Sequence, residues 1–435
     1  MIFQFAAPML LGNVFQQLFS VVDSFVVGNF VGKEALAAVG ASFPVIFVMV
    51  SMIIGIVMGT TVVISQYFGA KDFVNVKRAI DTMYIYSLVA GAVATVAGWI
   101  LSEPLLRMLG LPEEIMPQAT QYLHIYLSGT IIFFGFNGTS AVLRGLGDSK
   151  TPLYFLIIAT VANIILDLLF VAVFKMGVAG AAYATLIANG LAFALAIYWL
   201  NKTHKLIRIA IRGLHFDRKV FRQSISIGLP TGIQQTLVAM GALALMGFVN
   251  TFGTNVIAGF SVASRLDALA TIPAMSFSQA LSTFVGQNIG AKKLERIRVG
   301  LIATVKMSGI VTIVTTIFMV LAGHLLMSLF TNDPEVIRVG YQYLTIVSIF
   351  YLLFTLMFIY NGVMRGAGDT LVPMFFSVLS LWIIRIPLAW YLSGKIGASG
   401  IWWSIPAGWS VGLALSFLYY KSGRWKKKTV VKYQD

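Results

Sequence analysis

The stretch Arg144-Gly145-Leu146-Gly147-Asp148-Ser149-Lys150-Thr151-Pro152 recurs in the second half of the chain as Arg365-Gly366-Ala367-Gly368-Asp369-Thr370-Leu371-Val372-Pro373. Both copies read R-G-x-G-D-x-x-x-P, and the shift from Arg144 to Arg365 defines a repeat offset. Further landmarks repeat at nearly the same offset: Gln66…Gly69-Ala70-Lys71 with Gln287…Gly290-Ala291-Lys292, and Gly177-x-x-Gly180 with Gly397-x-x-Gly400. Self-similarity at one long offset means that the 435-residue chain consists of two homologous halves.

The composition places these halves in a membrane. Hydrophobic residues make up 58% of the chain and charged residues only 11%, whereas soluble domains carry roughly 25% charged residues. Hydrocarbon is the natural solvent for so much apolar surface. The chain has no cysteine, which excludes disulfides and thiolate metal sites, and no Gly-x-x-x-x-Gly-Lys-Ser/Thr sequence that would indicate a nucleotide site.

A membrane-spanning helix needs about 20 apolar residues. The sequence predicts twelve such spans, six in each half, at 3–28, 38–66, 79–101, 117–143, 152–174, 178–200, 223–250, 256–285, 299–323, 338–363, 373–393 and 399–420. An even number per half means that both halves enter the membrane in the same sense. We therefore expect an all-α polytopic membrane protein whose two six-helix lobes are related by a pseudo-two-fold axis along the membrane normal, a plan common among secondary transporters.

Basic residues set the expected orientation. With the N-terminus in the cytoplasm, cytoplasmic segments hold 23 of the 31 lysines and arginines and outer segments hold five. This asymmetry follows the positive-inside rule, and it explains the net charge of +15 without a nucleic-acid partner. We expect a multi-pass protein of the cell (inner) membrane with both termini cytoplasmic. No cleavable signal peptide is visible, and Met1 opens inside an apolar helix, so we expect a few residues to precede it.

The span positions divide the chain into four parts. Residues 1–200 form an N-lobe, 201–222 a basic linker, 223–420 a C-lobe and 421–435 a basic cytoplasmic tail. The linker is basic and roughly amphipathic, so we expect it to lie along the anionic inner leaflet. In the two R-G-x-G-D loops glycine allows a tight turn, Asp caps the next helix and Pro suits its first turn. We also expect Arg and Asp to pair within each loop.

Two carboxylates lie well inside predicted spans of the first half, away from the first residues of a span, where an ionisable group is costly unless it has a purpose. Asp23 lies near the outer end of the first span, and Asp167 lies in the outer half of the fifth. Asn163 is four residues before Asp167 and shares its helix face. Thr185 of the sixth span and Gln16 of the first span add oxygens at this place.

The second half keeps the scaffold without these charges. Gln16-Gln17 recurs as Gln234-Gln235, and the same shift places Gly241 at the equivalent of Asp23, while the shift from Arg144 to Arg365 places Leu388 at the equivalent of Asp167. A carboxylate pair that served only packing would more plausibly be kept in both halves. Its presence in one half indicates a function that is needed once per molecule. Two carboxylates with amide and hydroxyl oxygens suit a hard cation such as Na⁺. Burial and mutual repulsion also favour a bound proton. The alternative is structural: Asp167 bonds only Asn163 and nearby backbone.

Asp267 is another acid well inside a span, the eighth. Arg265 is two residues away and cannot face it on a helix, so Arg385 of the eleventh span is the candidate partner. Two interpretations stay open for Asp267. It belongs either to a buried ion-pair network or to a substrate cavity in the second lobe.

The chain resembles the multidrug and toxic compound extrusion (MATE) family over essentially its whole length. The resemblance rests on the 6+6 repeat, Pro8, the R-G-x-G-D loops, Asn163-x-x-x-Asp167 with Thr185, the Gln-x-x-x-x-x-Val-Asp-Ser run that ends in Val22-Asp23-Ser24, and Ser282-Thr283-Phe284-Val285-Gly286-Gln287-Asn288. It implies an antiporter in which inward Na⁺ or H⁺ movement drives export of amphipathic, often cationic, compounds.

The resemblance also implies residue roles. Asp23, Asn163, Asp167 and Thr185 match the cation site of the branch that couples in the N-lobe. Tyr122 and Asn137 match polar cavity residues, and Gln16 and Asp267 join them as candidate substrate contacts. Pro8 matches a first-span proline associated with helix bending, with Gly12 nearby. The second-lobe acids of another branch are missing here, because the seventh span has no acid.

We therefore expect a monomeric exporter that is not an enzyme, needs no cofactor beyond the coupling ion Na⁺ or H⁺, and takes membrane lipids and small amphipathic molecules as partners. Metal binding is expected only as Na⁺ at the four N-lobe residues. The first alternative is a flippase for a lipid-linked saccharide of the same superfamily. A major-facilitator transporter also has 6+6 spans, but the characteristic basic loop is absent, since Gly69-Ala70-Lys71-Asp72 does not fit it.

Overall fold

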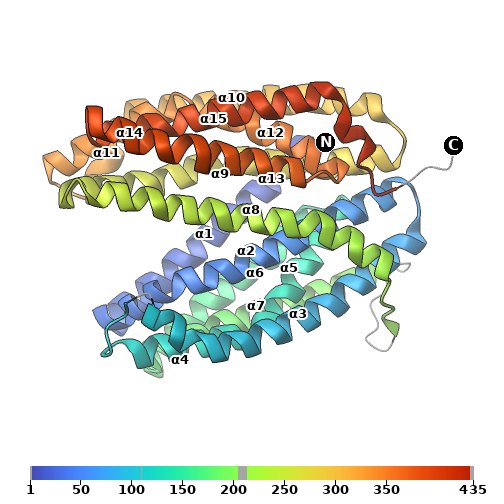
Figure 1. Cartoon of the computed structure of the whole chain (residues 1–435). Coiled ribbons are helices and arrows are strands. Elements are labelled where there is room, and N and C mark those ends of the chain that lie inside the picture. Colours follow the sequence, from blue (N-terminus) through green and yellow to red (C-terminus); the bar gives the residue numbers. More distant parts are fainter. Residues whose placement is uncertain (1, 109, 204–212, 432–435) are drawn as a thin grey trace. The chain divides into compact units, whose positions relative to one another are not determined.

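The computed structural model describes residues 2–108, 110–203 and 213–431. For Ser20, Val48 and Met52 it describes the backbone only. Apart from short turns and loops, this part of the chain is helical (Figure 1). Its helices are α1 Ile2–Phe30, α2 Lys33–Gly69, α3 Phe73–Met108, α4 Met116–Ser128, α5 Thr130–Gly145, α6 Lys150–Asp167, η1 Leu168–Val173, α7 Gly177–Thr203, α8 Arg218–Asn250, α9 Thr254–Gly290, α10 Leu294–Ser328, α11 Pro334–Ser348, α12 Tyr351–Ala367, α13 Leu371–Val378, η4 Leu379–Arg385, α14 Ile386–Ile396, α15 Ala398–Ser422 and η5 Arg424–Lys427.

These helices confirm the predicted fold class. Within the described residues, ten helices are long and apolar enough to cross a membrane, and two bent pairs raise the number to as many as twelve. A helix satisfies all of its interior backbone hydrogen bonds within itself, which is why such sequences form helices in hydrocarbon. The six helical regions expected in each half are all present. The predicted amphipathic linker falls largely on 204–212, which lies outside the described residues.

The fourth and tenth spans differ from the continuous helices that hydrophobicity predicts. Helices α4 and α5 meet at an angle of 47°, and α11 and α12 meet at 50°. The first break lies at Gly129, and the second lies at residues 349–350. The bend recurs in both halves although glycine marks only the first, because Phe350 occupies the position that the repeat offset gives for Gly129. The repeat therefore preserves the bend without preserving the residue.

The chain forms two compact units. One consists of Leu11–Gly232, and the other of Met1–Leu10 with Ile233–Asp435. The boundaries fall inside α1 and α8, so each of these helices contributes residues to both units. The division into lobes at residues 200 and 223 stays a prediction.

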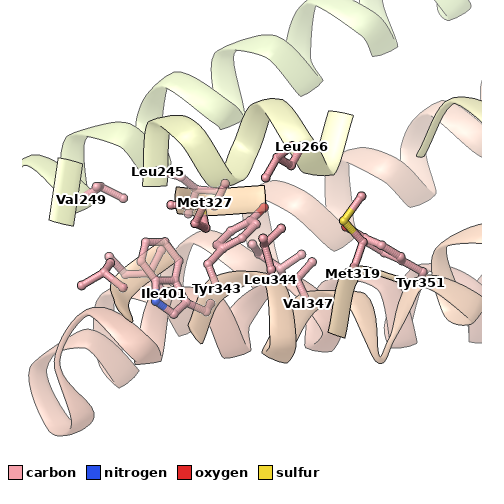
Figure 2. Packing of buried hydrophobic residues seen from close by; sticks show 14 of the residues in the cluster. Leu245, Val249, Leu266, Met319, Met327, Tyr343, Leu344, Val347, Tyr351 and Ile401 are labelled. Carbon is pink, nitrogen blue, oxygen red and sulfur yellow. The ribbon is translucent and has the colours of Figure 1, made fainter. Parts of the chain in front are cut away.

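The second unit, Met1–Leu10 with Ile233–Asp435, has a dense aromatic core (Figure 2). Trp402 is fully buried, and its ring stacks on Phe260 at 5.3 Å and meets Tyr343 edge-on at 5.1 Å. Leu344 and Val347 of α11 pack in the same cluster. This core fixes the face of α11 that carries Tyr343.

The two R-G-x-G-D loops have the same backbone conformation at their second glycine but differ in their side-chain contacts. Gly147 and Gly368 both have φ of 95°, a left-handed conformation that favours glycine and makes the turn. Asp148 caps α6 by accepting hydrogen bonds from the N–H groups of Lys150 and Thr151, both at 3.0 Å. Asp369 instead accepts a hydrogen bond from the Tyr419 hydroxyl at 2.6 Å.

The expected Arg–Asp pair within each loop is wrong for the second loop. Arg365 donates to Ser278 Oγ at 3.0 Å, on the neighbouring helix α9. Asp369 is satisfied by Tyr419. The loop thus joins two different helices instead of closing on itself, because its charged side chains point to α9 and α15.

Candidate functional site

The four predicted cation-site residues come from three helices of the unit Leu11–Gly232. Asp23 lies in α1, Asn163 and Asp167 lie in the last two turns of α6, and Thr185 lies in α7. All four are buried, with exposed fractions of 9%, 0%, 0% and 3% in that order. Two carboxylates are thereby enclosed among apolar helices, where an unpartnered charge is costly.

The structure brings these four side chains together. Thr185 Oγ1 donates a hydrogen bond to Asp23 Oδ2 at 3.1 Å. Asp23 also interacts with the side chains of Asp167 and Asn163. The hydroxyl of Thr185 therefore orients one oxygen of Asp23 and leaves its second oxygen available.

Most polar atoms of the cluster are buried without a hydrogen bond in the described part of the chain. They are Asp23 Oδ1, both carboxylate oxygens of Asp167, and both Oδ1 and Nδ2 of Asn163. Buried polar groups in folded proteins are nearly always hydrogen-bonded. Such a concentration of acceptor oxygens suits a small hard cation or a proton shared by the carboxylates.

The local structure of α6 explains how Asn163 and Asp167 face the same way. They are four residues apart and so lie on one helix face. The π-helix η1 begins immediately after Asp167 and runs from Leu168 to Val173. Short π-helical stretches are rare and frequently occur at functional sites.

Tyr122 of α4 completes the cluster. Its side chain is buried and lies within electrostatic range of both Asp23 and Asp167. The Tyr122 ring stacks on Tyr126 at 6.0 Å, and Tyr126 stacks on Phe133 of α5 at 4.7 Å. This aromatic row crosses the α4–α5 bend and ties the tyrosine to both helices.

Two other predicted cavity residues are not brought to the carboxylates. Asn137 is half-buried on α5, and its Nδ2 donates to the carbonyl of Phe133 at 2.9 Å in its own helix. Gln16 is exposed on α1, two turns before Asp23. No interaction among the described residues joins either side chain to Asp23 or Asp167.

The predicted bending residues flank the place where α1 passes from one unit to the other. Pro8 is buried and lies in the segment Met1–Leu10, whereas Gly12 lies in Leu11–Gly232. A Cβ placed on Gly12 would meet Leu156 and Leu153 of α6 at 3.6 and 3.9 Å, which are ordinary contacts. Helix α1 is continuous through both residues.

Asp267 lies in the other unit with different partners. The hydroxyl of Tyr351, in α12, donates to Asp267 Oδ1 at 2.7 Å. Tyr343 and Arg385 also lie within interaction range of the carboxylate. The sequence pointed to Arg385 as a partner of Asp267, but not to Tyr343 or Tyr351, and not to Tyr126 beside Tyr122. Only Tyr343 had a signal in the sequence, because it is the repeat equivalent of Tyr122.

The described residues contain no group of three or more His, Cys, Asp and Glu side chains that could hold a metal ion. The donor set at Asp23 and Asp167 is thus two carboxylates, one amide and one hydroxyl. This set suits a transported monovalent ion better than a transition metal, which prefers imidazole or thiolate ligands.

Known proteins share both the fold and the two-half organisation of this chain. The sequence model of the MatE family matches residues 8–169 and 230–391, once in each half. The probable multidrug resistance protein YpnP of Bacillus subtilis is 35% identical over 423 residues, with 97% of this chain and 94% of YpnP covered. The probable multidrug resistance protein NorM of Thermotoga maritima is 28% identical, with 98% and 93% covered.

A solved multidrug resistance MATE family transporter of the MOP superfamily has the same fold, with a TM-score of 0.92 and 24% identity. The comparison covers 98% of this chain and 96% of that one. The flippase alternative is not favoured by these matches. The family match in both halves, the similarity to curated multidrug resistance proteins and the shared fold together show that this chain belongs to the MATE family of multidrug efflux transporters.

Proposed function

We propose that this chain is an antiporter that couples inward movement of Na⁺ or H⁺ to export of amphipathic, often cationic, compounds. The observation that carries the proposal is the buried group of Asp23, Asp167 and Asn163, whose polar atoms largely lack hydrogen bonds. A bound cation or proton supplies the missing partner and lowers the cost of burying two carboxylates. In this proposal the site is most stable when it is loaded.

Coupling follows from competition for the same negative charge. With the carboxylates ionised, the site attracts a cationic substrate. When Na⁺ or H⁺ binds, the charge is neutralised and that attraction falls, so the substrate is released. Thr185 orients Asp23 in either state through its hydroxyl, and Asn163 offers an amide oxygen to Na⁺ or a donor N–H to a carboxylate.

The first transmembrane helix is the element that we propose responds to the ion. It carries Asp23 and also passes from one unit to the other near Leu10. Pro8 removes a backbone hydrogen bond in this region, and Gly12 lacks a side chain, so α1 bends here more easily than elsewhere. A change at Asp23 can therefore reach both units through one helix.

Several features of the membrane context belong to the same proposal. We place the protein in the cell (inner) membrane with both termini in the cytoplasm, as the basic residues favour. We propose that it acts as a monomer, without enzymatic activity or cofactor. Its relatives are named for multidrug resistance and, in Shewanella oneidensis, for FAD transport, so the substrates are small molecules.

The test uses ethidium efflux from proteoliposomes that contain the full chain. A Na⁺ gradient and a pH gradient are imposed separately, with the other ion equal on both sides. The proposal predicts efflux under one gradient and none without a gradient. If neither gradient drives ethidium or any other amphipathic cation, the coupling proposal is wrong.

A further inference from the structure

The second unit contains a charged cluster inside its spanning helices that the coupling site does not use. Asp267 of α9, Tyr343 of α11, Tyr351 of α12 and Arg385 at the end of η4 converge there. Tyr351 donates to Asp267 Oδ1 at 2.7 Å. Figure 2 shows Tyr343 and Tyr351 among the packed residues of the core of this unit. Core packing therefore holds in place the helices that carry Tyr343 and Tyr351.

The internal repeat relates this cluster to the carboxylate site. Gln121-Tyr122-Leu123 recurs at the repeat offset as Gln342-Tyr343-Leu344. Tyr122 lies near Asp23 and Asp167, and Tyr343 lies near Asp267 and Arg385. The equivalent helices also carry the π-helical stretches, since η1 follows Asp167 and η4 ends at Arg385. Each half thus places ionisable groups beside the equivalent tyrosine.

The charges of the two clusters differ. Two carboxylates meet in the first unit, and no ion pair among the described residues joins a basic side chain to either of them. In the second unit one carboxylate lies within electrostatic range of one guanidinium, so the two charges offset each other. A pure cation is attracted to the first cluster, but in the second it is attracted by Asp267 and repelled by Arg385.

Arg385 has unused hydrogen-bonding capacity. Its side chain is half-buried, its Nε is fully enclosed, and no residue in the described part of the chain accepts a hydrogen bond from it. None of the ion pairs among these residues joins it to Asp267. A guanidinium has five N–H donors that match a carboxylate in a two-pronged geometry. Its stem is held near Gly408, because a Cβ placed on that glycine would lie 3.2 Å from Arg385 Cβ.

We propose that this cluster, which we call the Asp267–Arg385 site, recognises the zwitterionic part of a transported compound. A carboxylate of the ligand binds the free donors of Arg385, and a nearby cationic group lies against Asp267. Adjacent opposite charges complement a zwitterion and disfavour a ligand of single charge on either side. The proposal deepens the proposed export function by naming a substrate class, but the binding test below needs no ion coupling.

The test measures binding of two probes that differ in one charge. Rhodamine B carries a free carboxylate and is a zwitterion at neutral pH, and its ethyl ester is a cation with the same ring system. Fluorescence polarisation gives both Kd values for the purified full-length protein without any gradient. We expect Arg385→Gln to weaken rhodamine B at least tenfold. The same change should not weaken the ester, because the repulsion between Arg385 and a cationic ligand is lost. Arg385→Lys keeps the positive charge but loses the paired N–H donors of the guanidinium, so we expect its affinity for rhodamine B to lie between those of wild type and Arg385→Gln.

Two further variants keep the result interpretable. The double variant Asp267→Asn, Arg385→Gln removes both charges together and leaves neither without its opposite, so we expect it to fold even where a single variant does not. We expect it to bind both probes with equal affinity. Lys306→Gln removes an exposed charge from α10 of the same unit and preserves the wild-type ratio of Kd values.

A ratio of Kd values in Arg385→Gln or in the double variant that stays within twofold of wild type overturns the proposal. Absence of rhodamine B binding to wild-type protein also overturns it. Failure of gradient-driven ethidium efflux refutes the coupling proposal alone, because the rhodamine measurement is made at equilibrium.

Discussion

At the residue scale, the two carboxylates of the first unit are held unequally. Asp23 receives the hydroxyl of Thr185 on one oxygen, whereas both oxygens of Asp167 are buried without a hydrogen bond. The proposed ion therefore matters more to Asp167, and Asp23 is the orienting member of the pair. The sequence predicted both acids and their neighbours, because a charge within an apolar span stands out. It could not predict which oxygen Thr185 would bond.

Thr185→Val tests this orienting hydrogen bond. The change keeps the shape of the side chain and removes its donor, and a hydrogen bond to a charged group is worth about 1.5–3 kcal/mol. We expect the apparent ion affinity in driven efflux to fall about tenfold or more. Thr160→Val is the matched control, because Thr160 is buried in α6 and, among the residues that the structure describes, its hydroxyl bonds only the carbonyl of Leu156. Equal effects of the two changes would contradict an orienting role for Thr185.

At the element scale, glycines set how closely helices approach. In the repeated Arg-Gly pair, a Cβ on Gly366 would lie 2.3 Å from the carbonyl oxygen of Ser282, and one on Gly145 would lie 2.8 Å from Ile64 Cγ2. Sequence reasoning assigned the loop glycines to a turn, which Gly147 and Gly368 make. It missed this packing role, because close approach between distant helices leaves no local pattern.

Gly366→Ala is expected to destabilise the protein by about 1–3 kcal/mol, since backbone atoms of α9 must move to admit the methyl group. Thermal unfolding of the purified protein in detergent measures the loss. Gly247→Ala in the same unit is the control, because nothing lies within 4 Å of its Cβ position. An unfolding temperature for Gly366→Ala as high as that of Gly247→Ala would show that the helices separate without cost.

Gly12→Ala tests bending of α1 separately from stability. Its methyl group makes ordinary contacts with α6, and alanine stabilises a helix by about 0.5–1 kcal/mol relative to glycine. We expect unchanged or higher thermal stability with ethidium efflux reduced several-fold. Gly40→Ala, with nothing within 4 Å of its Cβ position on α2, should transport normally. Wild-type efflux by Gly12→Ala would contradict the proposal that α1 bends near this residue during transport.

At the scale of the whole molecule, one scaffold is used twice with different charges. The sequence predicted the helical class, the six spans per half and the repeat, because hydrophobicity and spacing report these directly. The bend at Phe350, the π-helices and the contacts of Tyr351 depend on packing between helices far apart in sequence, and so no local signal predicted them. Glycine marks the bend at Gly129, but hydrophobicity alone predicted a continuous helix there. The equivalent tyrosines, Tyr122 and Tyr343, show what the repeat could have revealed.

The central claim is that Asp23 and Asp167 couple the ion to export. The most direct measurement is gradient-driven ethidium efflux by Asp23→Asn and Asp167→Asn in proteoliposomes at matched protein amounts. Asp81→Asn is the control, because Asp81 is also buried in the first unit but pairs with Lys77. We predict that both site variants lose driven efflux while the control retains it. Full driven efflux by Asp23→Asn would contradict the account.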